Sequence, residues 1–94
     1  MNAEHNHLLI QQLIKTIASI QNEDDCRRFF NDLCTNKEIE QMAQRWQAAK
    51  LLNQGLTYNQ VIEQTDISSA TLSRVSRALQ YGEGYKRMFK DENK

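Results

Sequence analysis

The sequence contains no proline, three glycines and two cysteines in 94 residues. Its β-branched residues never alternate with polar ones over the length of a strand, so nothing in it predicts a β-sheet. The two cysteines form no C-x-x-C pair and lie far from both histidines, which excludes a disulfide framework and a zinc site. The longest apolar run, Leu8–Ile10, is too short for a signal peptide or a membrane span. We therefore expect a cytoplasmic protein with reduced thiols.

The length and composition bound the kind of protein. With 39% hydrophobic and 26% charged residues, the chain matches one small globular domain. It has no room for a catalytic domain beside a cofactor domain and shows no grouping of catalytic residues, so we expect no enzyme. A domain of this size buries a modest share of its surface, and oligomerisation would stabilise it. Its 12 basic and 12 acidic residues cancel, which at first argues against nucleic acid as a partner.

Two helices are predicted in the first third of the chain. Apolar spacing predicts one over about 5–20, and Asn22 followed by acidic residues predicts a second that ends near Leu33. Phe29, Phe30 and Leu33 are expected to point inward. The first helix has a broad apolar face, made of Leu9, Ile10, Leu13, Ile14, Ile17 and Ile20. Such a face needs a partner, either the rest of the chain or a second subunit.

A third helix is predicted between a capping box and a glycine. Thr35 and Glu38 have the spacing at which side chains and backbone amides satisfy each other at a helix start. Helical spacing continues to about Asn53, and Gly55 suits the left-handed conformation that ends a helix. We interpret Trp46 in this helix as a core or dimer-interface residue and not as a ligand contact.

Residues 58–79 have the spacing of a helix-turn-helix, in which two short helices cross steeply over a tight turn. Thr57 and Ser68 suit the two N-caps. Asp66 stands in the turn, where many such motifs have glycine, and aspartate tolerates a left-handed conformation better than most residues. The positions that the motif buries are apolar: Val61, Ile62, Ile67, Leu72, Val75 and Leu79. The alternative is an ordinary helical hairpin with solvated serines.

The second helix of this motif, called the reading helix below, has an exposed face of small, hydrogen-bonding and basic residues. Such a face suits insertion into the major groove of DNA. The residues expected to face base edges are Ser69, Ala70, Ser73 and Arg74. The residues expected to position phosphates are Ser68, Thr71 and Arg77.

The charge of the chain is unevenly distributed. Residues 67–90 hold five basic residues and one acidic residue, whereas residues 1–66 hold six basic and nine acidic residues. The last four residues add a net charge of −1. Positive charge therefore gathers on the reading helix and the segment after it, as phosphate contact requires, although the whole chain is neutral.

From Leu33 to Leu79 the sequence resembles the Trp repressor family, and within it the Trp-repressor-like YerC/YecD subgroup. The stretches that carry the resemblance are residues 33–38, 45–46, 55–58 and 70–74, with an ending at 81–85 similar to that of the subgroup. The resemblance implies an all-α, intertwined homodimer of about six short helices on a palindromic operator in double-stranded DNA. Its parts would be dimerisation helices (1–34), a central helix (35–56), the helix-turn-helix (57–80) and a C-terminal helix and tail (81–94).

The resemblance also implies an effector site at Thr35, Arg45 and Arg74, with L-tryptophan or a related small molecule as co-repressor. Val75 stands where the repressor has glycine, and its bulk argues against that ligand. The alternative for Arg45 is a surface or subunit-interface salt bridge, and Arg74 is also a candidate for direct DNA contact. Glu63 stands where the repressor has a basic residue, and it should repel phosphate.

These observations predict a dimeric, sequence-specific DNA-binding transcriptional regulator, in particular a repressor. Two alternatives remain at this point. One is a DNA-binding protein without ligand control, and the other is a helical protein-interaction module without operator specificity.

Overall fold

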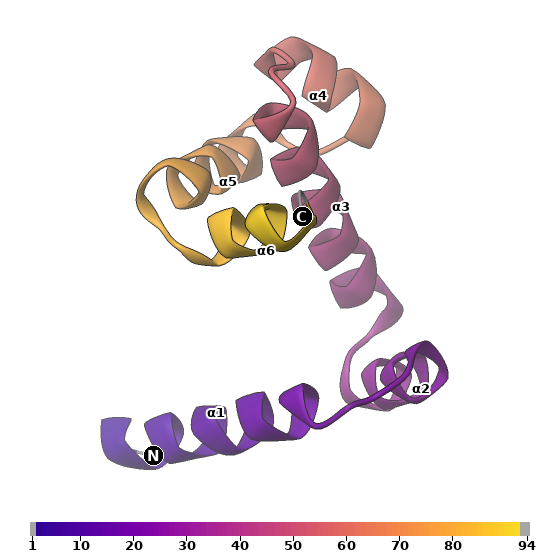
Figure 1. The fold of residues 1–94 in the computed structure, drawn as a ribbon, viewed down its shortest axis with the longest axis vertical. Helices are drawn as coiled ribbons and strands as arrows, with labels where there is room; N and C mark the ends of the chain where they lie inside the picture. The colour runs from indigo at the N-terminus through magenta and orange to yellow at the C-terminus, as the bar shows by residue number, and fades with distance from the viewer. Residues whose placement is uncertain (1, 93–94) are drawn as a thin grey trace. The chain divides into compact units, whose positions relative to one another are not determined.

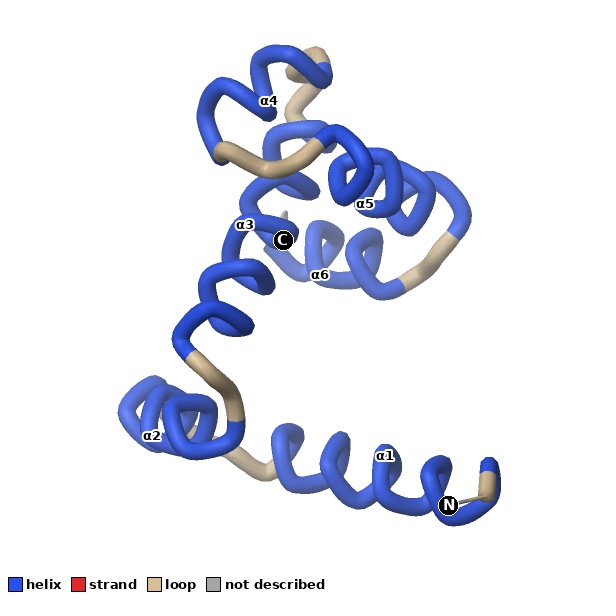
Figure 2. The backbone as a smooth tube through the Cα atoms, turned by 180° about the vertical axis from the view of Figure 1, so that it is seen from behind, coloured by secondary structure: helices blue, strands red, loops and turns tan. Residues whose placement is uncertain are grey.

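The computed structural model describes residues 2–92, with the backbone alone for residues 91 and 92. Every regular element in this range is a helix (Figures 1 and 2). The helices are α1 (Ala3–Ala18), α2 (Glu23–Leu33), α3 (Asn36–Asn53), α4 (Tyr58–Thr65), α5 (Ser69–Tyr81) and α6 (Gly84–Glu92). The predicted all-α fold is confirmed. None of these helices is both long and apolar enough to cross a membrane.

The helices group into two compact units, and the boundary lies between Asn36 and Lys37. The first unit holds α1 and α2, and the second holds α4, α5, α6 and nearly all of α3. The buried apolar side chains all belong to the second unit: Ala48, Ala49, Leu51, Val61, Ile67, Leu72, Val75 and Phe89. The core of the described chain is therefore built by α3 to α6.

Both helices of the first unit start at a capping asparagine. Asn2 Oδ1 accepts a hydrogen bond from the His5 amide, and Asn22 Oδ1 accepts one from the Asp25 amide, each at 2.8 Å. The cap at Asn22 was predicted, whereas the predicted bounds of the first helix, 5–20, are two residues late at both ends. Asn2 provides an earlier cap, and the Ser19 hydroxyl satisfies an end carbonyl, that of Thr16, at 2.7 Å.

Neither helix of the first unit buries a side chain. Phe29 and Phe30 are half-buried and pack edge to face, with ring centroids 6.0 Å apart. The prediction that Leu33 points inward is wrong, because this side chain is 47% exposed. Two helices alone are too small to enclose apolar side chains. On α1 the exposed apolar residues are Leu8, Leu9, Ile10, Leu13 and Ile14.

In the second unit the predicted buried positions of the helix-turn-helix are occupied as expected. Val61, Ile67, Leu72 and Val75 are buried, and Ile62 and Leu79 are half-buried and pack against them. The neighbouring α3 contributes Ala48 and Ala49, whose small side chains allow close approach of the helices. The apolar spacing alone therefore identified this part of the core.

The last helix, α6, runs from Gly84 to Glu92, inside the segment predicted as a C-terminal helix and tail (81–94). Phe89 is buried, and both Phe89 and Tyr85 stack on Trp46 of α3. These aromatic contacts with α3 stabilise a helix too short to be stable by itself. They also confirm Trp46 as a residue packed against the core. Residues 93 and 94 of the predicted tail lie outside the described range.

The turn between α4 and α5 contains a residue in the left-handed conformation, Asp66, with φ of 60°. We expect Asp66→Gly to raise the free energy of unfolding by about 0.5–1 kcal/mol, because glycine has no Cβ to oppose this conformation. Urea denaturation measures the difference. Gly55, with φ of 97° and no heavy atom within 4 Å of an added Cβ, provides the reverse control. Gly55→Ala should be destabilising, and a less stable Asp66→Gly would contradict the prediction.

Candidate nucleic-acid interface

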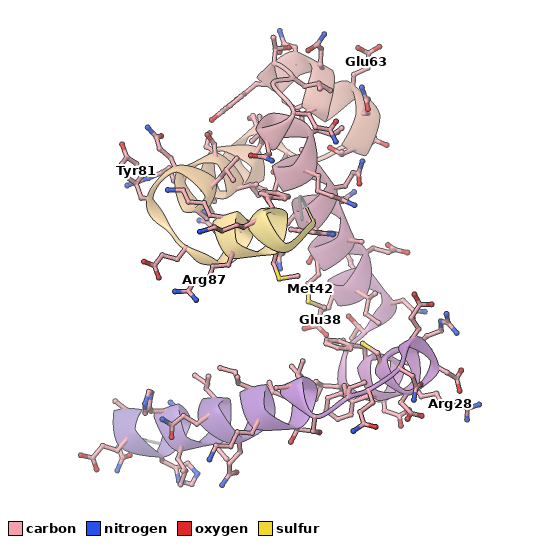
Figure 3. The ribbon with its side chains drawn as sticks, viewed as in Figure 1. Arg28, Glu38, Met42, Glu63, Tyr81 and Arg87 are labelled. Carbon is pink, nitrogen blue, oxygen red and sulfur yellow. The ribbon has the colours of Figure 1, made fainter. Side chains whose placement is uncertain are left out.

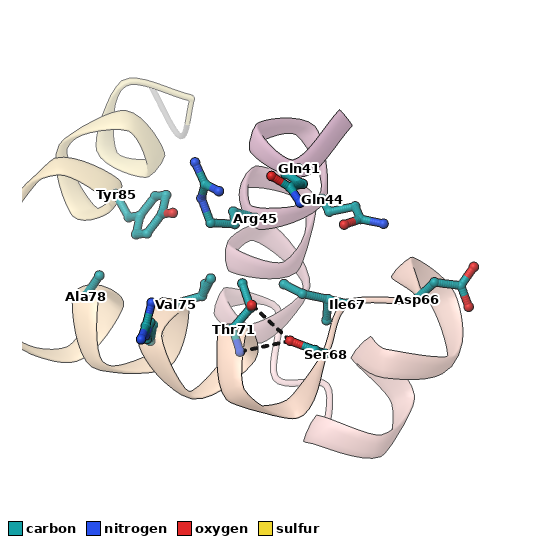
Figure 4. Close-up of a pocket in the computed structure, with 11 residues that line it drawn as sticks. Gln41, Gln44, Arg45, Asp66, Ile67, Ser68, Thr71, Val75, Ala78 and Tyr85 are labelled. Carbon is teal, nitrogen blue, oxygen red and sulfur yellow. Dashed lines mark hydrogen bonds between the residues drawn. The ribbon is translucent and has the colours of Figure 1, made fainter. Parts of the chain in front are cut away.

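The reading helix corresponds to α5, which starts at a serine cap. Ser68 Oγ accepts a hydrogen bond from the Thr71 amide at 3.2 Å and donates one to Thr71 Oγ1 at 2.9 Å (Figure 4). Because the Thr71 hydroxyl accepts this bond, its own hydrogen stays available for donation. The start of α5 therefore presents backbone amides beside a hydroxyl donor, a combination that suits a phosphate oxygen.

The exposed and buried residues of α5 lie on opposite faces. Leu72 and Val75 are buried in the core and Leu79 is half-buried against it. The exposed face carries Ser69, Ala70, Ser73, Arg74 and Arg77. Of the remaining predicted DNA-binding residues, Ser68 is exposed and Thr71 is half-buried. The structure thus presents the predicted residues together on one helix and its cap.

Hydrogen bonds connect the turn before α5 to α3. Gln44 of α3 donates from Nε2 to the Thr65 carbonyl at 3.2 Å. The Thr65 hydroxyl donates to the Val61 carbonyl at 2.7 Å and accepts from the Ile67 amide at 3.3 Å. The direction in which α5 leaves the turn is therefore fixed by α3 as well as by α4.

Charges at this interface are uncompensated. Within residues 2–90, Arg74 and Arg77 make no ion pair or hydrogen bond, whereas Arg87 of α6 lies 4.0 Å from Glu83. On α4, Glu63 points outward (Figure 3) and is exposed. The side chain of Gln60 is engaged in the capping box of α4, where its Oε1 accepts a hydrogen bond from the Thr57 amide at 2.9 Å. The reading helix is thus basic, and α4 offers one exposed carboxylate.

A cleft of about 630 Å³, called the arginine cleft below, opens beside the reading helix. Arg45 of α3 and Arg74 of α5 both line it. Val75 of α5 and Tyr85 of α6 line it as well, and Figure 4 shows both beside Arg45. The structure therefore brings two of the three predicted effector residues to one cleft. The third, Thr35, belongs to the first unit, whereas every residue that lines this cleft belongs to the second.

Two details of the arginine cleft bear on a ligand. Val75 is only 2% exposed, and its side chain points from α5 toward α3 (Figure 4), so its methyl groups take up space that glycine would leave open. Arg45 is half-buried and has no ion-pair partner within residues 2–90. A surface salt bridge of Arg45 therefore finds no partner among these residues, and a subunit-interface salt bridge remains a prediction.

Comparison with known families shows to which family the chain belongs. Residues 9–93 match the family model described as Trp repressor protein. The chain belongs to the Trp repressor family. It is 45% identical over 73 residues to the uncharacterized protein YerC of Bacillus subtilis (strain 168), a match that covers 78% of this chain and 70% of YerC. The predicted resemblance is confirmed.

Two solved structures are similar to this member of the Trp repressor family. One is a candidate Trp repressor from Staphylococcus aureus, with a TM-score of 0.86 and 38% identity, over 92% of this chain and 87% of that one. The other is a TrpR-like protein from Eubacterium eligens ATCC 27750, with a TM-score of 0.89 and 39% identity, over 98% of this chain and 96% of that one. The Trp repressor family consists of DNA-binding helical regulators and not of enzymes. This agrees with the predictions that the chain is a DNA-binding regulator and that it is no enzyme.

Sequence reasoning missed the part that α6 plays in this family member. Tyr85 was quoted only as part of an ending, yet it lines the arginine cleft and stacks on Trp46. A signal was present, because Tyr85 and Phe89 are four residues apart and so lie on one face of a helix. The spacing did not lead to a prediction of core packing, because two glycines precede this segment and many of its residues are charged.

Proposed function

We propose that the protein is a transcriptional repressor that binds a palindromic operator as a homodimer through the helix-turn-helix of α4 and α5. The observation that carries the proposal is the exposed face of α5, where Arg74 and Arg77 stand beside small polar residues and have no ion-pair partner among residues 2–90. In this proposal Ser69, Ala70, Ser73 and Arg74 read base edges. Ser68, Thr71 and Arg77 hold phosphates and fix the register on the duplex.

The uncovered face of α1 supports the dimer. Its exposed leucines and isoleucines would be unfavourable in water, and a second copy of the chain would cover them. Twofold symmetry then places two reading helices about one DNA turn apart, which accounts for a palindromic site. A DNA-binding regulator of this kind would act in the cytoplasm.

The proposal is tested by selection from a pool of random duplexes, followed by a mobility-shift assay on the selected sequence. We expect a palindromic consensus whose half-sites lie about 10 base pairs apart, and binding at least about a thousandfold tighter than to a scrambled duplex. Selection that yields no consensus would reject the operator and favour the protein-interaction module.

L-Tryptophan is expected to act as a weak effector or as none. The arginine cleft keeps Arg45 and Arg74, but on the side of the cleft formed by the reading helix Val75 occupies space that glycine would leave open. Titration calorimetry should give no measurable heat with L-tryptophan at concentrations up to about 1 mM, which corresponds to a weak affinity. Operator affinity should also be the same with and without it. Heat of binding together with tighter operator binding would instead identify L-tryptophan as the co-repressor.

Removal of the carboxylate on α4 is expected to strengthen DNA binding. Glu63 is exposed on the helix that precedes the reading helix, so it should repel nearby phosphates. Glu63→Gln should raise affinity for both operator and scrambled duplex by about two- to fivefold at low salt. Fluorescence anisotropy at two salt concentrations measures the change. Glu23→Gln, which alters the net charge equally from α2, is the control and should have a smaller effect.

A further inference from the structure

Helix α6 is joined to α3 by an aromatic stack. The ring of Trp46 on α3 lies 6.0 Å from that of Tyr85 and 5.3 Å from that of Phe89, measured between centroids, with interplanar angles of 21° and 10°. Phe89 is buried in the core, and Lys50 Nζ lies 5.4 Å from the Trp46 ring centroid. This stack fixes one face of α6 against the central helix.

Helix α6 is also held closely to the reading helix, alongside which it runs (Figures 1 and 2). The connection between α5 and α6 consists of Gly82 and Glu83 alone. A Cβ on Gly82 would lie 2.7 Å from the Ala78 carbonyl oxygen, so the chain turns there without room for a side chain. Lys86 Nζ donates to the Gln80 carbonyl at 2.9 Å, which satisfies an end carbonyl of α5.

Tyr85 stands where these two sets of contacts meet. Its ring stacks on Trp46 of α3, and its side chain extends beside Arg45 at the arginine cleft (Figure 4). The same cleft is lined by Val75 and Ala78 of the reading helix. Tyr85 thus touches the space that separates α3 from α5, and it is half-buried there.

We propose that α6 is an internal brace, with Tyr85 as its positioning residue, that holds the reading helix against α3 so that specific DNA binding needs no small molecule. A ligand in the arginine cleft would stabilise the DNA-binding arrangement by contacting α3 and α5 together. The brace makes the same connection from within the chain, where its effective concentration is constant. This inference rests on the proposed function and adds to it the absence of ligand control.

The test uses the full chain, unfolded in denaturant, washed and refolded to remove any bound small molecule. The wild-type protein should bind the selected operator specifically without any addition. Tyr85→Ala should lower operator affinity by about tenfold, the size of effect that loss of an aromatic contact produces. Its affinity for scrambled duplex should not change, because the basic residues remain. The ratio of the two affinities therefore reports the position of α5, whereas unfolding would reduce both.

Two variants serve as controls. Tyr81→Ala removes the same side chain from a 77% exposed site on α5, where it points outward (Figure 3), and it should bind like the wild type. Tyr85→Phe keeps the ring and should also bind like the wild type. If circular dichroism shows that Tyr85→Ala does not fold, Tyr85→Leu, which keeps the apolar volume, should still lower the affinity ratio by about threefold.

Three outcomes would overturn the brace. Tyr85→Ala with an unchanged affinity ratio would show that the reading helix is positioned without α6. A wild-type protein that binds the operator only after small molecules from a cell extract are restored would show ligand control. A protein that selects no duplex in either condition would reject the proposed function itself, and the brace with it. The first two outcomes leave the DNA-binding function intact. Failure of the brace is therefore distinguishable from failure of the proposed function.

Discussion

Replacement of Arg74 by alanine is expected to lower operator affinity by about 10- to 100-fold, the range for loss of a bidentate contact to a base edge. Arg74 is exposed on the reading face and has no ion-pair partner within residues 2–90, so its guanidinium is available to DNA. The loss should be largest for the selected operator and small for scrambled duplex. Discrimination at one base pair of each half-site should relax. Fluorescence anisotropy with operator variants measures both effects.

Arg77 and Arg87 provide the comparisons for this result. Arg77→Ala should weaken all duplexes alike and reduce the salt slope of binding by about one, as expected of a phosphate contact. Arg87→Ala removes the same charge from α6, where the guanidinium lies 4.0 Å from Glu83 and both side chains are exposed, and it should leave operator affinity nearly unchanged. Undiminished operator binding by both Arg74→Ala and Arg77→Ala at moderate salt would reject α5 as the reading helix.

A charge on the apolar face of α1 is expected to convert the protein to a monomer. Ile14 is 59% exposed in the isolated chain, so Ile14→Glu should cost the fold of one protomer little. In the proposed dimer the same position is covered, and an unpaired carboxylate buried there is strongly destabilising. A monomer loses the simultaneous engagement of two half-sites, so operator affinity should fall by a factor on the order of 100 or more.

Light scattering coupled to size-exclusion chromatography gives the mass, and a mobility-shift assay gives the affinity. Gln11→Glu adds the same charge to α1 outside its apolar face and should remain dimeric with wild-type binding. Dimeric Ile14→Glu would show that α1 is not the subunit interface. A monomeric wild-type protein would reject the dimer altogether.

The helix-turn-helix and the caps of its two helices were predictable because their causes are local. The Ser68 cap, the capping-box helix start at Thr57 and the left-handed Asp66 each depend on residues within four positions along the chain. The burial of Leu72 and Val75 follows from helical periodicity alone. The basic character of the reading helix is likewise visible as soon as charge is counted by segment.

The role of the last helix was not predictable in this way. Short helices gain most of their stability from packing, and the packing partner of Tyr85 and Phe89 is Trp46, which is distant in sequence. The inward orientation of Leu33 was wrong for a related reason. Periodicity identifies an apolar face but not what covers it, and within the chain Leu33 stays largely exposed.

By itself the sequence determined the all-α class, the helix-turn-helix and the segregation of positive charge at the reading end, since these follow from nearest-neighbour spacing and side-chain chemistry. Only the tertiary structure decided that Arg45 and Arg74 line one cleft, that Val75 belongs to the core beside it, and that Tyr85 reaches the same place from α6. Those facts depend on how three helices pack. Helix packing is set by the complementarity of whole surfaces, which no single stretch of residues contains.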